Sequence, residues 1–289
     1  MRLREILVPE FDLGMTLNCG QVFHWQKHGR GFTGAIAETP TYVEQEGHLV
    51  RFAGIDAKEL AHYFAFDHLL TEICASFPKD AALQTARQFC RGLRIIRQPK
   101  WECLATFICS SMKQLGHIRQ ISLSLRKRFG TARKICGQQV LLFPPAERIA
   151  DASEKELQES ALGYRAKNLR ATAQQIASGA VDLASWSGLS DLELHDRLCA
   201  LPGVGTKVAN CVMLFAYERI GAFPIDVWIE RVLREKYFAQ RQSATKKELA
   251  KFASGYFGAY GGYAQQYLFH YARTAGKQKR EDSSSVSRC

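Results

Sequence analysis

A glycine-rich stretch, residues 201–207 (Leu-Pro-Gly-Val-Gly-Thr-Lys), constrains the fold of this chain more than any other part of its sequence. Pro202 ends one helical pattern, and a second helical pattern begins at Thr206. We expect Gly203 and Gly205 to adopt positive φ in a tight loop between the two helices. The result is a helix-hairpin-helix, in which loop amides and the positive end of the second helix face outward, toward a phosphate oxygen.

Lys207 and Asp226 are the two residues near this loop that can carry chemistry. Lys207 lies in the first turn of the second helix, where its amine can act as a nucleophile or neutralise a phosphate. Asp226 directly precedes the apolar-periodic run 227–238, so its carboxylate can cap a third helix. Taken alone, the pattern fits a catalytic pair or a non-catalytic clamp on a nucleic-acid backbone equally well, with Asp226 only a cap.

The combination of hairpin, hydrophobic helix and Pro-x-Asp helix start resembles the helix-hairpin-helix (HhH-GPD) DNA glycosylase superfamily. Within it, residues 203–211 and 224–227 are most similar to the 8-oxoguanine DNA glycosylases of the bacterial type. The resemblance implies a bifunctional glycosylase and AP (abasic-site) lyase. Lys207 would attack the sugar C1′ and displace the base, leaving a Schiff base that β-elimination converts to a nick. Asp226 would stabilise positive charge on the sugar.

The composition is compatible with this reading. The chain has 289 residues, 46% of them hydrophobic, which is enough for one large or two modest cores, and its formal net charge is +11 with a pI near 9.3. Such a charge favours an anionic partner. The resemblance implies that this partner is damaged double-stranded DNA, bound by a monomer, and that no metal or organic cofactor is required.

The nine cysteines include no Cys-x-x-Cys pair, which predicts reduced thiols in a cytosolic-type compartment. Only Cys289 lies beyond Cys211, so the chain lacks the four closely spaced cysteines of the iron–sulfur loop found in the endonuclease III and adenine-glycosylase branches. No apolar run reaches membrane length, and the N-terminal residues contain no signal-peptide core. We therefore expect an unexported cytoplasmic protein, associated with the nucleoid in a bacterium.

Hydrophobic periodicity predicts a mostly helical α+β fold. Residues 1–97 are expected to form an antiparallel sheet followed by helices, because the links between strands are too short for parallel crossovers. Residues 98–276 are expected to form the helical HhH-GPD domain, and residues 277–289, basic and then serine-rich, a disordered tail. The expected strands are residues 6–8, 21–26, 31–37, 41–46 and 48–52.

The resemblance assigns four residues to a pocket for the damaged base. Residues 18–25 resemble the family's Gly-Gln-x-Phe-x-Trp segment, in which Gly20 lets its carbonyl approach the purine edge. Gln265 and Phe269 are spaced i and i+4, so they project from one helix face and can grip a base by its edge and ring, with Cys211 on the opposite side. Without the resemblance, Gly20 is a turn residue before a strand and Phe269 an ordinary core residue.

The residues expected to contact the base opposite the lesion depart from the family. The helix of residues 101–111 matches it well, but Met112-Lys113-Gln114 replace an asparagine run and His117 replaces an arginine. Met112 is better suited to fill a hole or wedge into a stack than to read the edge of cytosine. We therefore expect relaxed opposite-base specificity.

The loop of residues 162–167 fits the next DNA-contacting element of the family. There the resemblance assigns Tyr164 to wedge into the duplex, replacing lost stacking, and Arg165 to hydrogen-bond the estranged base. The backbone-contacting glycines of the hairpin are present, but Trp228 stands where the family often has a phosphate-contacting histidine. A tryptophan supplies one N–H and no charge.

Two other functions remain compatible with the sequence. One is a glycosylase of the same superfamily for alkylated or other oxidised bases, although Gly20 and the set Cys211, Gln265 and Phe269 argue against it. The other is a catalytically silent module that binds damaged DNA. Incision of a panel of duplexes, with each lesion opposite each base, separates the three.

Overall fold

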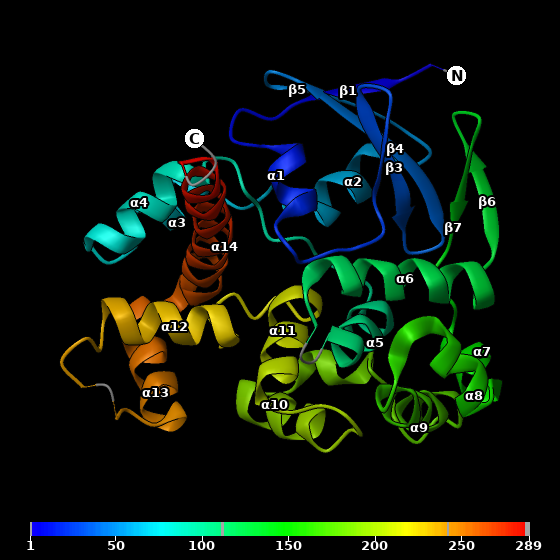
Figure 1. Ribbon diagram of the computed structural model, residues 1–289. Helices are drawn as coiled ribbons and strands as arrows, with labels where there is room; N and C mark the ends of the chain where they lie inside the picture. The colour runs from blue at the N-terminus through cyan, green and yellow to red at the C-terminus, as the bar shows by residue number, and fades with distance from the viewer. Residues whose placement is uncertain (1, 111–112, 242, 287–289) are drawn as a thin grey trace.

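The computed structural model describes residues 2–110, 113–241 and 243–286, with side chains of the last helix described as far as residue 275 (Figure 1). Five antiparallel strands form one sheet in the order β1-β5-β4-β3-β2, which confirms the predicted sheet. Its buried face packs on α1 (Leu13–Asn18) and α2 (Ala57–Tyr63) around Phe52 and Phe64. The strands are β1 Arg4–Leu7, β2 Gln26–His28, β3 Gly31–Ile36, β4 Thr39–Glu46 and β5 Leu49–Ala53.

One predicted strand is wrong over most of its length, because residues 21–25 are irregular and only the three residues of β2 pair with the sheet. The polar groups of this segment bond elsewhere. The Gln21 side chain accepts from the amide of Ile96 (2.8 Å), and the Gln21 carbonyl accepts from the Gln98 side chain (2.8 Å). The segment therefore lies against residues 90–99, the linker between α4 (Ala81–Phe89) and α5 (Lys100–Ser110), rather than against a neighbouring strand.

A hairpin that the sequence analysis did not predict, β6 (Ala132–Ile135) and β7 (Gln138–Leu141), forms a separate two-stranded sheet that packs on the face of the large sheet opposite to α1 and α2. Its two-residue turn is Cys136-Gly137, both with positive φ (49° and 74°), as a tight hairpin turn requires. Ile135 and Val140 pack on Ala35 and Tyr42 of the sheet.

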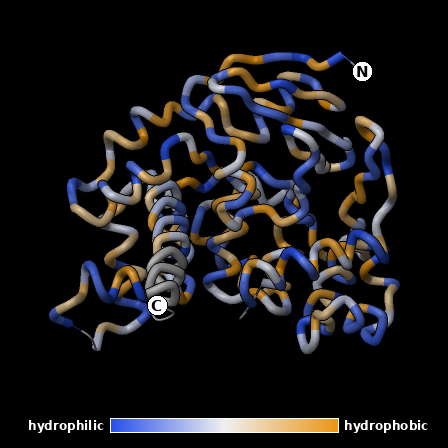
Figure 2. Tube along the Cα trace, turned by 45° about the horizontal axis from the view of Figure 1, so that its top comes forward, coloured by the Kyte–Doolittle hydropathy of each residue, from blue (hydrophilic) through white to orange (hydrophobic). Residues whose placement is uncertain are grey.

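The remaining described chain is largely helical and surrounds α5 and α11, which lie in the middle of its core. From Glu102 to Ser110 every residue of α5 is buried. In Figure 2, hydrophobic and hydrophilic segments alternate along the helices, as expected when each helix buries one face. The helices are α5 Lys100–Ser110, α6 Leu115–Phe129, α7 Ala146–Asp151, α8 Glu154–Leu157, α9 Arg165–Ala177, α10 Asp191–Cys199, α11 Thr206–Ala216, α12 Val227–Lys236, α13 Lys246–Phe257 and α14 Gly261–Val286, with short turns at Gln158–Leu162, Ser185–Gly188 and Gly258–Tyr260.

Two helices from the N-terminal third, α3 (Leu70–Ala75) and α4 (Ala81–Phe89), pack on the C-terminal helix α14 instead of on the sheet (Figure 1). Ile73 and Leu83 share the helical core with Tyr267 of α14. The predicted unit of residues 1–97 is thus divided in space: its sheet part has its own core, and its last two helices complete the helical domain.

The helix α14 reaches Val286, past residue 277, where the sequence analysis expects a disordered tail to begin. The backbone of residues 277–286 is therefore helical, not disordered as the sequence analysis expects. Among the described residues, no helix combines the length and apolar character needed to cross a membrane.

Candidate active site

The glycine loop joins α10 to α11, as predicted, but its two glycines differ. Gly203 has φ of +81°, and a Cβ there would lie 2.8 Å from the Cβ of Asn168. Gly205 has φ of −103° and ψ of 176° and is the N-cap of α11, so the prediction of positive φ at Gly205 is wrong. A single left-handed residue turns the chain, and a Cβ on Gly205 would meet no atom within 4 Å. The second glycine leaves the exposed start of α11 uncovered.

Lys207 lies in the first turn of α11 and points toward the C-terminal end of α5. Its Nζ donates to the Ser110 Oγ (3.2 Å) and lies 5.0 Å from the centre of the Phe107 ring. The Ser110 hydroxyl itself donates to the Phe107 carbonyl (2.7 Å), so its oxygen is an acceptor for the amine. These contacts hold the half-buried amine at one place beside the hairpin.

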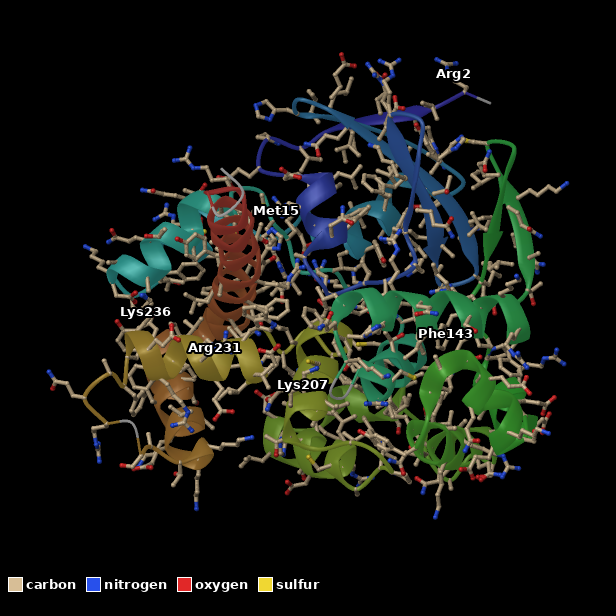
Figure 3. All side chains as sticks on the ribbon, viewed as in Figure 1. Arg2, Met15, Phe143, Lys207, Arg231 and Lys236 are labelled. Carbon is tan, nitrogen blue, oxygen red and sulfur yellow. The ribbon has the colours of Figure 1, made fainter. Side chains whose placement is uncertain are left out.

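Asp226 caps α12, and the first turn of α12 points its amides at this carboxylate. Its Oδ1 accepts from the amides of Trp228 (3.1 Å) and Ile229 (2.9 Å). Figure 3 shows Lys236, Arg231 and Lys207 in sequence across the view, so the N-terminal end of α12 is directed toward Lys207. Burial raises the pKa of Asp226, while the amide of Ile229 and the charge of Lys207 oppose that shift. The predicted cap is confirmed, and it lies within electrostatic reach of the amine.

Of the four predicted pocket residues, Cys211 and Phe269 belong to the helical core, Gly20 lies next to Phe269, and Gln265 lies one turn before Phe269 on α14. Gly20 has φ of +97°, and a Cβ on it would lie 3.2 Å from Cε1 of Phe269. Gln265 is 4% exposed, and its Oε1 is buried with no hydrogen-bond donor among the described residues. Cys211 is buried one turn beyond Lys207, and burial raises its pKa, against the charge of Lys207. An unpaired buried carbonyl costs about 1–3 kcal/mol, which a ligand donating to Gln265 would recover.

Sequence comparison identifies the family of this two-part architecture. The 8-oxoguanine DNA glycosylase N-terminal domain matches residues 5–104, and the HhH-GPD superfamily of base excision DNA repair proteins matches residues 105–256. The chain belongs to the HhH-GPD superfamily. The HhH-GPD fold with an N-terminal antiparallel sheet, expected from the sequence, is confirmed.

Individual relatives agree with this assignment. An N-glycosylase/DNA lyase of Arabidopsis thaliana is 30% identical over 90% of this chain and 77% of its own length. A probable N-glycosylase/DNA lyase of Methanothermobacter thermautotrophicus is 27% identical over 94% of this chain and 96% of its own. The structure of the Clostridium acetobutylicum 8-oxoguanine glycosylase/lyase, bound to DNA with cytosine opposite 8-oxoguanine, superposes with a TM-score of 0.87 at 29% identity and covers 96% of this chain and 99% of that one.

The loop before α9 holds two residues that were predicted to contact DNA, and only one of them is exposed at the surface. Tyr164 is 63% exposed, beyond a kink in which Ala161 and Gly163 have positive φ. Arg165 is only 5% exposed: its guanidinium lies 4.4 Å from the centre of the Tyr164 ring, and Nη1 donates to the Leu162 carbonyl (3.3 Å). The arginine therefore packs beneath the tyrosine in this conformation.

The other residues predicted to contact DNA differ in their exposure, and one of them lies outside the described residues. His117 is exposed in the first turn of α6, whereas Met112 lies outside the described residues. Trp228 is half-buried, with the guanidinium of Arg231 5.4 Å from its ring centre, which brings a positive charge next to the position where the family often has histidine. Sequence reasoning gave no role to Ser110 or Phe107, since no local pattern links them to a lysine almost one hundred residues away.

Proposed function

We propose that this protein is a bifunctional DNA glycosylase and AP lyase that removes 8-oxoguanine from duplex DNA and nicks the strand through a Schiff base on Lys207. The observation that carries the proposal is that Lys207, in the first turn of α11, and Asp226, the N-cap of α12, interact electrostatically, since burial raises the pKa of the Asp226 carboxyl and the charge of Lys207 partly offsets that rise. The proposal places the damaged base among Gly20, Cys211, Gln265 and Phe269, and it is supported by Gly20 lying next to Phe269 and by Cys211 and Phe269 sharing one core. The names of the relatives support the same reaction.

The pocket accounts for selection of the oxidised base. Guanine presents an acceptor at N7, whereas 8-oxoguanine carries a hydrogen there. The positive φ of Gly20 and the absence of a side chain let its backbone approach the edge of a flipped purine. A carbonyl in that place attracts the N7–H of the lesion and repels the N7 lone pair of guanine. Phe269 supplies a ring for stacking, and the unpaired Gln265 Oε1 accepts from the base.

The paired amine and carboxylate account for the chemistry. The Lys207 nitrogen forms a bond to C1′ as the glycosidic bond breaks, and the base leaves with the bonding electrons and takes up a proton. Ser110 accepts a hydrogen bond from the amine and so orients it. The Asp226 carboxylate stabilises positive charge as it develops on the sugar. The sugar ring then opens: the nitrogen forms a double bond to C1′ as the C1′–O4′ bond breaks, and O4′ takes up a proton, which gives a protonated Schiff base. Loss of a proton from C2′ of this Schiff base then expels the 3′ phosphate and nicks the strand.

Relaxed reading of the opposite base is part of the proposal. Within the described residues, His117 is exposed on α6 and Arg165 is packed under Tyr164. Neither forms a rigid set of donors and acceptors shaped to the edge of cytosine. Each well-made base contact contributes about 1–3 kcal/mol of discrimination. With few residues contacting the opposite base, we expect little preference for cytosine over the other bases.

Covalent trapping tests the proposed nucleophile. Sodium borohydride should link the wild-type protein to an 8-oxoguanine duplex, whereas Lys207→Gln should bind the same duplex without trapping or cutting. Lys236→Gln, on the far end of α12, is the matched control and should trap normally. A Lys207→Gln adduct that forms at the wild-type rate would show that another amine attacks C1′. The same assay on alkylated bases and other lesions tests the choice of substrate.

A further inference from the structure

Residues 19–21, here called the base-contact loop, are held by a fully buried glutamine. The side-chain amide of Gln21 donates to the carbonyls of Thr16 (3.1 Å) and Arg94 (2.7 Å). Its side-chain oxygen accepts from the amide of Ile96 (2.8 Å). Both amide hydrogens and the oxygen of the Gln21 side chain therefore form hydrogen bonds within the protein. These bonds connect the base-contact loop to the linker between α4 and α5.

A second glutamine connects the base-contact loop to the helix that carries Lys207. Gln98 Nε2 donates to the Gln21 carbonyl (2.8 Å), and the Gln98 backbone amide donates to the Phe215 carbonyl (2.7 Å). Phe215 lies near the C-terminal end of α11, whose first turn holds Lys207. Gln98 thus fixes the position of the loop relative to α11.

A third glutamine connects the loop to α14. Gln266 Nε2 donates to the Cys19 carbonyl (3.3 Å), and Gln266 is buried. It directly follows Gln265, on the helix that also holds Phe269. Because the Cys19 carbonyl belongs to the peptide that leads into Gly20, this bond sets the distance from Gly20 to the pocket wall on α14.

We propose that Gln98 and Gln266 are positioning residues that hold the Gly20 carbonyl at the pocket edge and thereby set selectivity for the damaged base. This inference rests on the proposed function. A carbonyl discriminates between N7–H and an N7 lone pair only at hydrogen-bonding distance, and the interaction weakens steeply beyond it. Neither residue is near enough to Lys207 to hydrogen-bond its amine in the described structure, so attack on an existing abasic site does not depend on them.

The test compares two activities of the same preparations. Gln98→Met and Gln266→Met keep the length of the side chain and remove its hydrogen bond, while Gln21, whose loss would leave several buried groups unpaired, is kept. Single-turnover excision of 8-oxoguanine should fall about fivefold in each variant, as expected for one buried hydrogen bond. Nicking of a preformed abasic duplex should stay within about twofold of wild type. Gln84→Met, on the exposed face of α4, is the control and should change neither rate.

The ratio of the two rates decides the inference, and the melting temperature is recorded for every variant. Parallel falls in both rates, or a lower melting temperature with an unchanged ratio, would show that the glutamines only stabilise the fold. A wild-type protein that nicks abasic DNA but leaves 8-oxoguanine in place would overturn the proposed function and this inference with it. An active wild type whose variants keep the wild-type ratio would overturn this inference alone.

Discussion

At the scale of single residues, Asp226 combines a structural and a proposed chemical role. Its Oδ1 takes both hydrogen bonds of the cap, and burial raises its pKa while Lys207 partly offsets that rise. Asn is a comparable N-cap, so Asp226→Asn separates the two roles. We expect base excision to slow by about 10² or more, because a preorganised charge beside a cationic transition state is lost. Single-turnover excision and urea unfolding measure the two effects.

The pH dependence of the same variant follows from the direction of that shift. A carboxyl group whose folded pKa is raised favours folding below its ordinary pKa, and that contribution is lost as pH rises through the folded value. Replacing Asp226 with Asn removes this loss, so the variant should be at least as stable as wild type at neutral pH. Wild-type excision should rise with pH as the carboxylate forms. Unchanged excision kinetics in Asp226→Asn would reduce the residue to a cap.

Local patterns predicted that Lys207 lies in the first turn of α11 and that Asp226 caps α12, because hairpin and cap signals lie within a few residues of each side chain. They could not predict that Ser110 accepts a hydrogen bond from the Lys207 amine, since that contact joins helices far apart in the chain. The error at Gly205 has a similar origin. A Gly-x-Gly sequence shows that the loop is tight, but it does not show which of the two glycines adopts positive φ, and in the structure it is Gly203.

At the scale of elements, the two hairpin glycines form a matched pair for mutation. Gly203→Ala should destabilise the protein by about 1–3 kcal/mol, because alanine is strained at φ of +81° and its Cβ would approach Asn168. Gly205→Ala should cost less, at most about 1 kcal/mol, because its backbone is extended and the space is open, although alanine is a poorer N-cap than glycine. Its methyl group would instead cover the exposed start of α11 and weaken binding to a duplex.

Urea unfolding and binding to an uncleavable abasic analogue distinguish the two hairpin variants. The expected pattern is a large fall in unfolding free energy for Gly203→Ala, and for Gly205→Ala a smaller fall together with a lower affinity for DNA. Equal affinity of Gly205→Ala and wild type would contradict the assignment of the loop to the DNA backbone.

The elements around the opposite base carry the next prediction. With Arg165 packed under Tyr164 and His117 exposed, the enzyme should cut 8-oxoguanine opposite adenine, guanine or thymine within about tenfold of its rate opposite cytosine. Single-turnover rates on the four duplexes measure this directly. A preference for cytosine above about a hundredfold would show that other residues rebuild the missing contacts. His117→Ala then tests whether histidine is one of them.

Element boundaries show where alternation misled the sequence analysis. Residues 21–26 alternate like a strand, yet residues 21–25 bond to the linker through Gln21 and Gln98. The β6–β7 hairpin was missed, although Cys136-Gly137 between short alternating segments was a usable turn signal. The consecutive strands β3, β4 and β5 were predicted with nearly the right bounds, because the short links between them leave few other pairings.

At the scale of the whole molecule, sequence order and spatial order differ. The helices α3 and α4 follow the sheet in the chain but pack on α14 at the other end of the sequence. Periodicity shows that α4 has an apolar face, but it does not show which helix covers that face. The expected base pocket likewise depends on segments far apart in the sequence, since Gly20 and Phe269 come into contact only once the chain has folded around α5 and α11.

The sheet unit and the helical domain also meet at a buried polar cluster. His24 follows the base-contact loop and donates through Nε2 to the Ala35 carbonyl (2.8 Å), while its Nδ1 lies 3.3 Å from Oε1 of Glu102 in α5. Arg126 of α6 pairs with the same carboxyl oxygen. Burial and then the charge of Arg126 lower the pKa of His24, and burial raises the pKa of Glu102.

This cluster predicts how the stability of the whole protein depends on pH. A histidine whose pKa is lowered on folding favours the folded state above its ordinary pKa, and that contribution is lost as pH falls below about 6.5. The slope is about 1.4 kcal/mol per pH unit for one proton. In urea unfolding at pH 7.5, 6.5 and 5.5, His24→Gln should flatten the wild-type slope by up to this amount, because glutamine can still donate to Ala35 but does not titrate. His68 and His270, whose pKa values burial also lowers, keep their contributions to the slope in this variant, so only the difference from wild type reports His24.

The exposed His48 provides the control. A His48→Gln variant that flattens the slope as much as His24→Gln would show that protonation of the buried cluster does not cause the pH dependence.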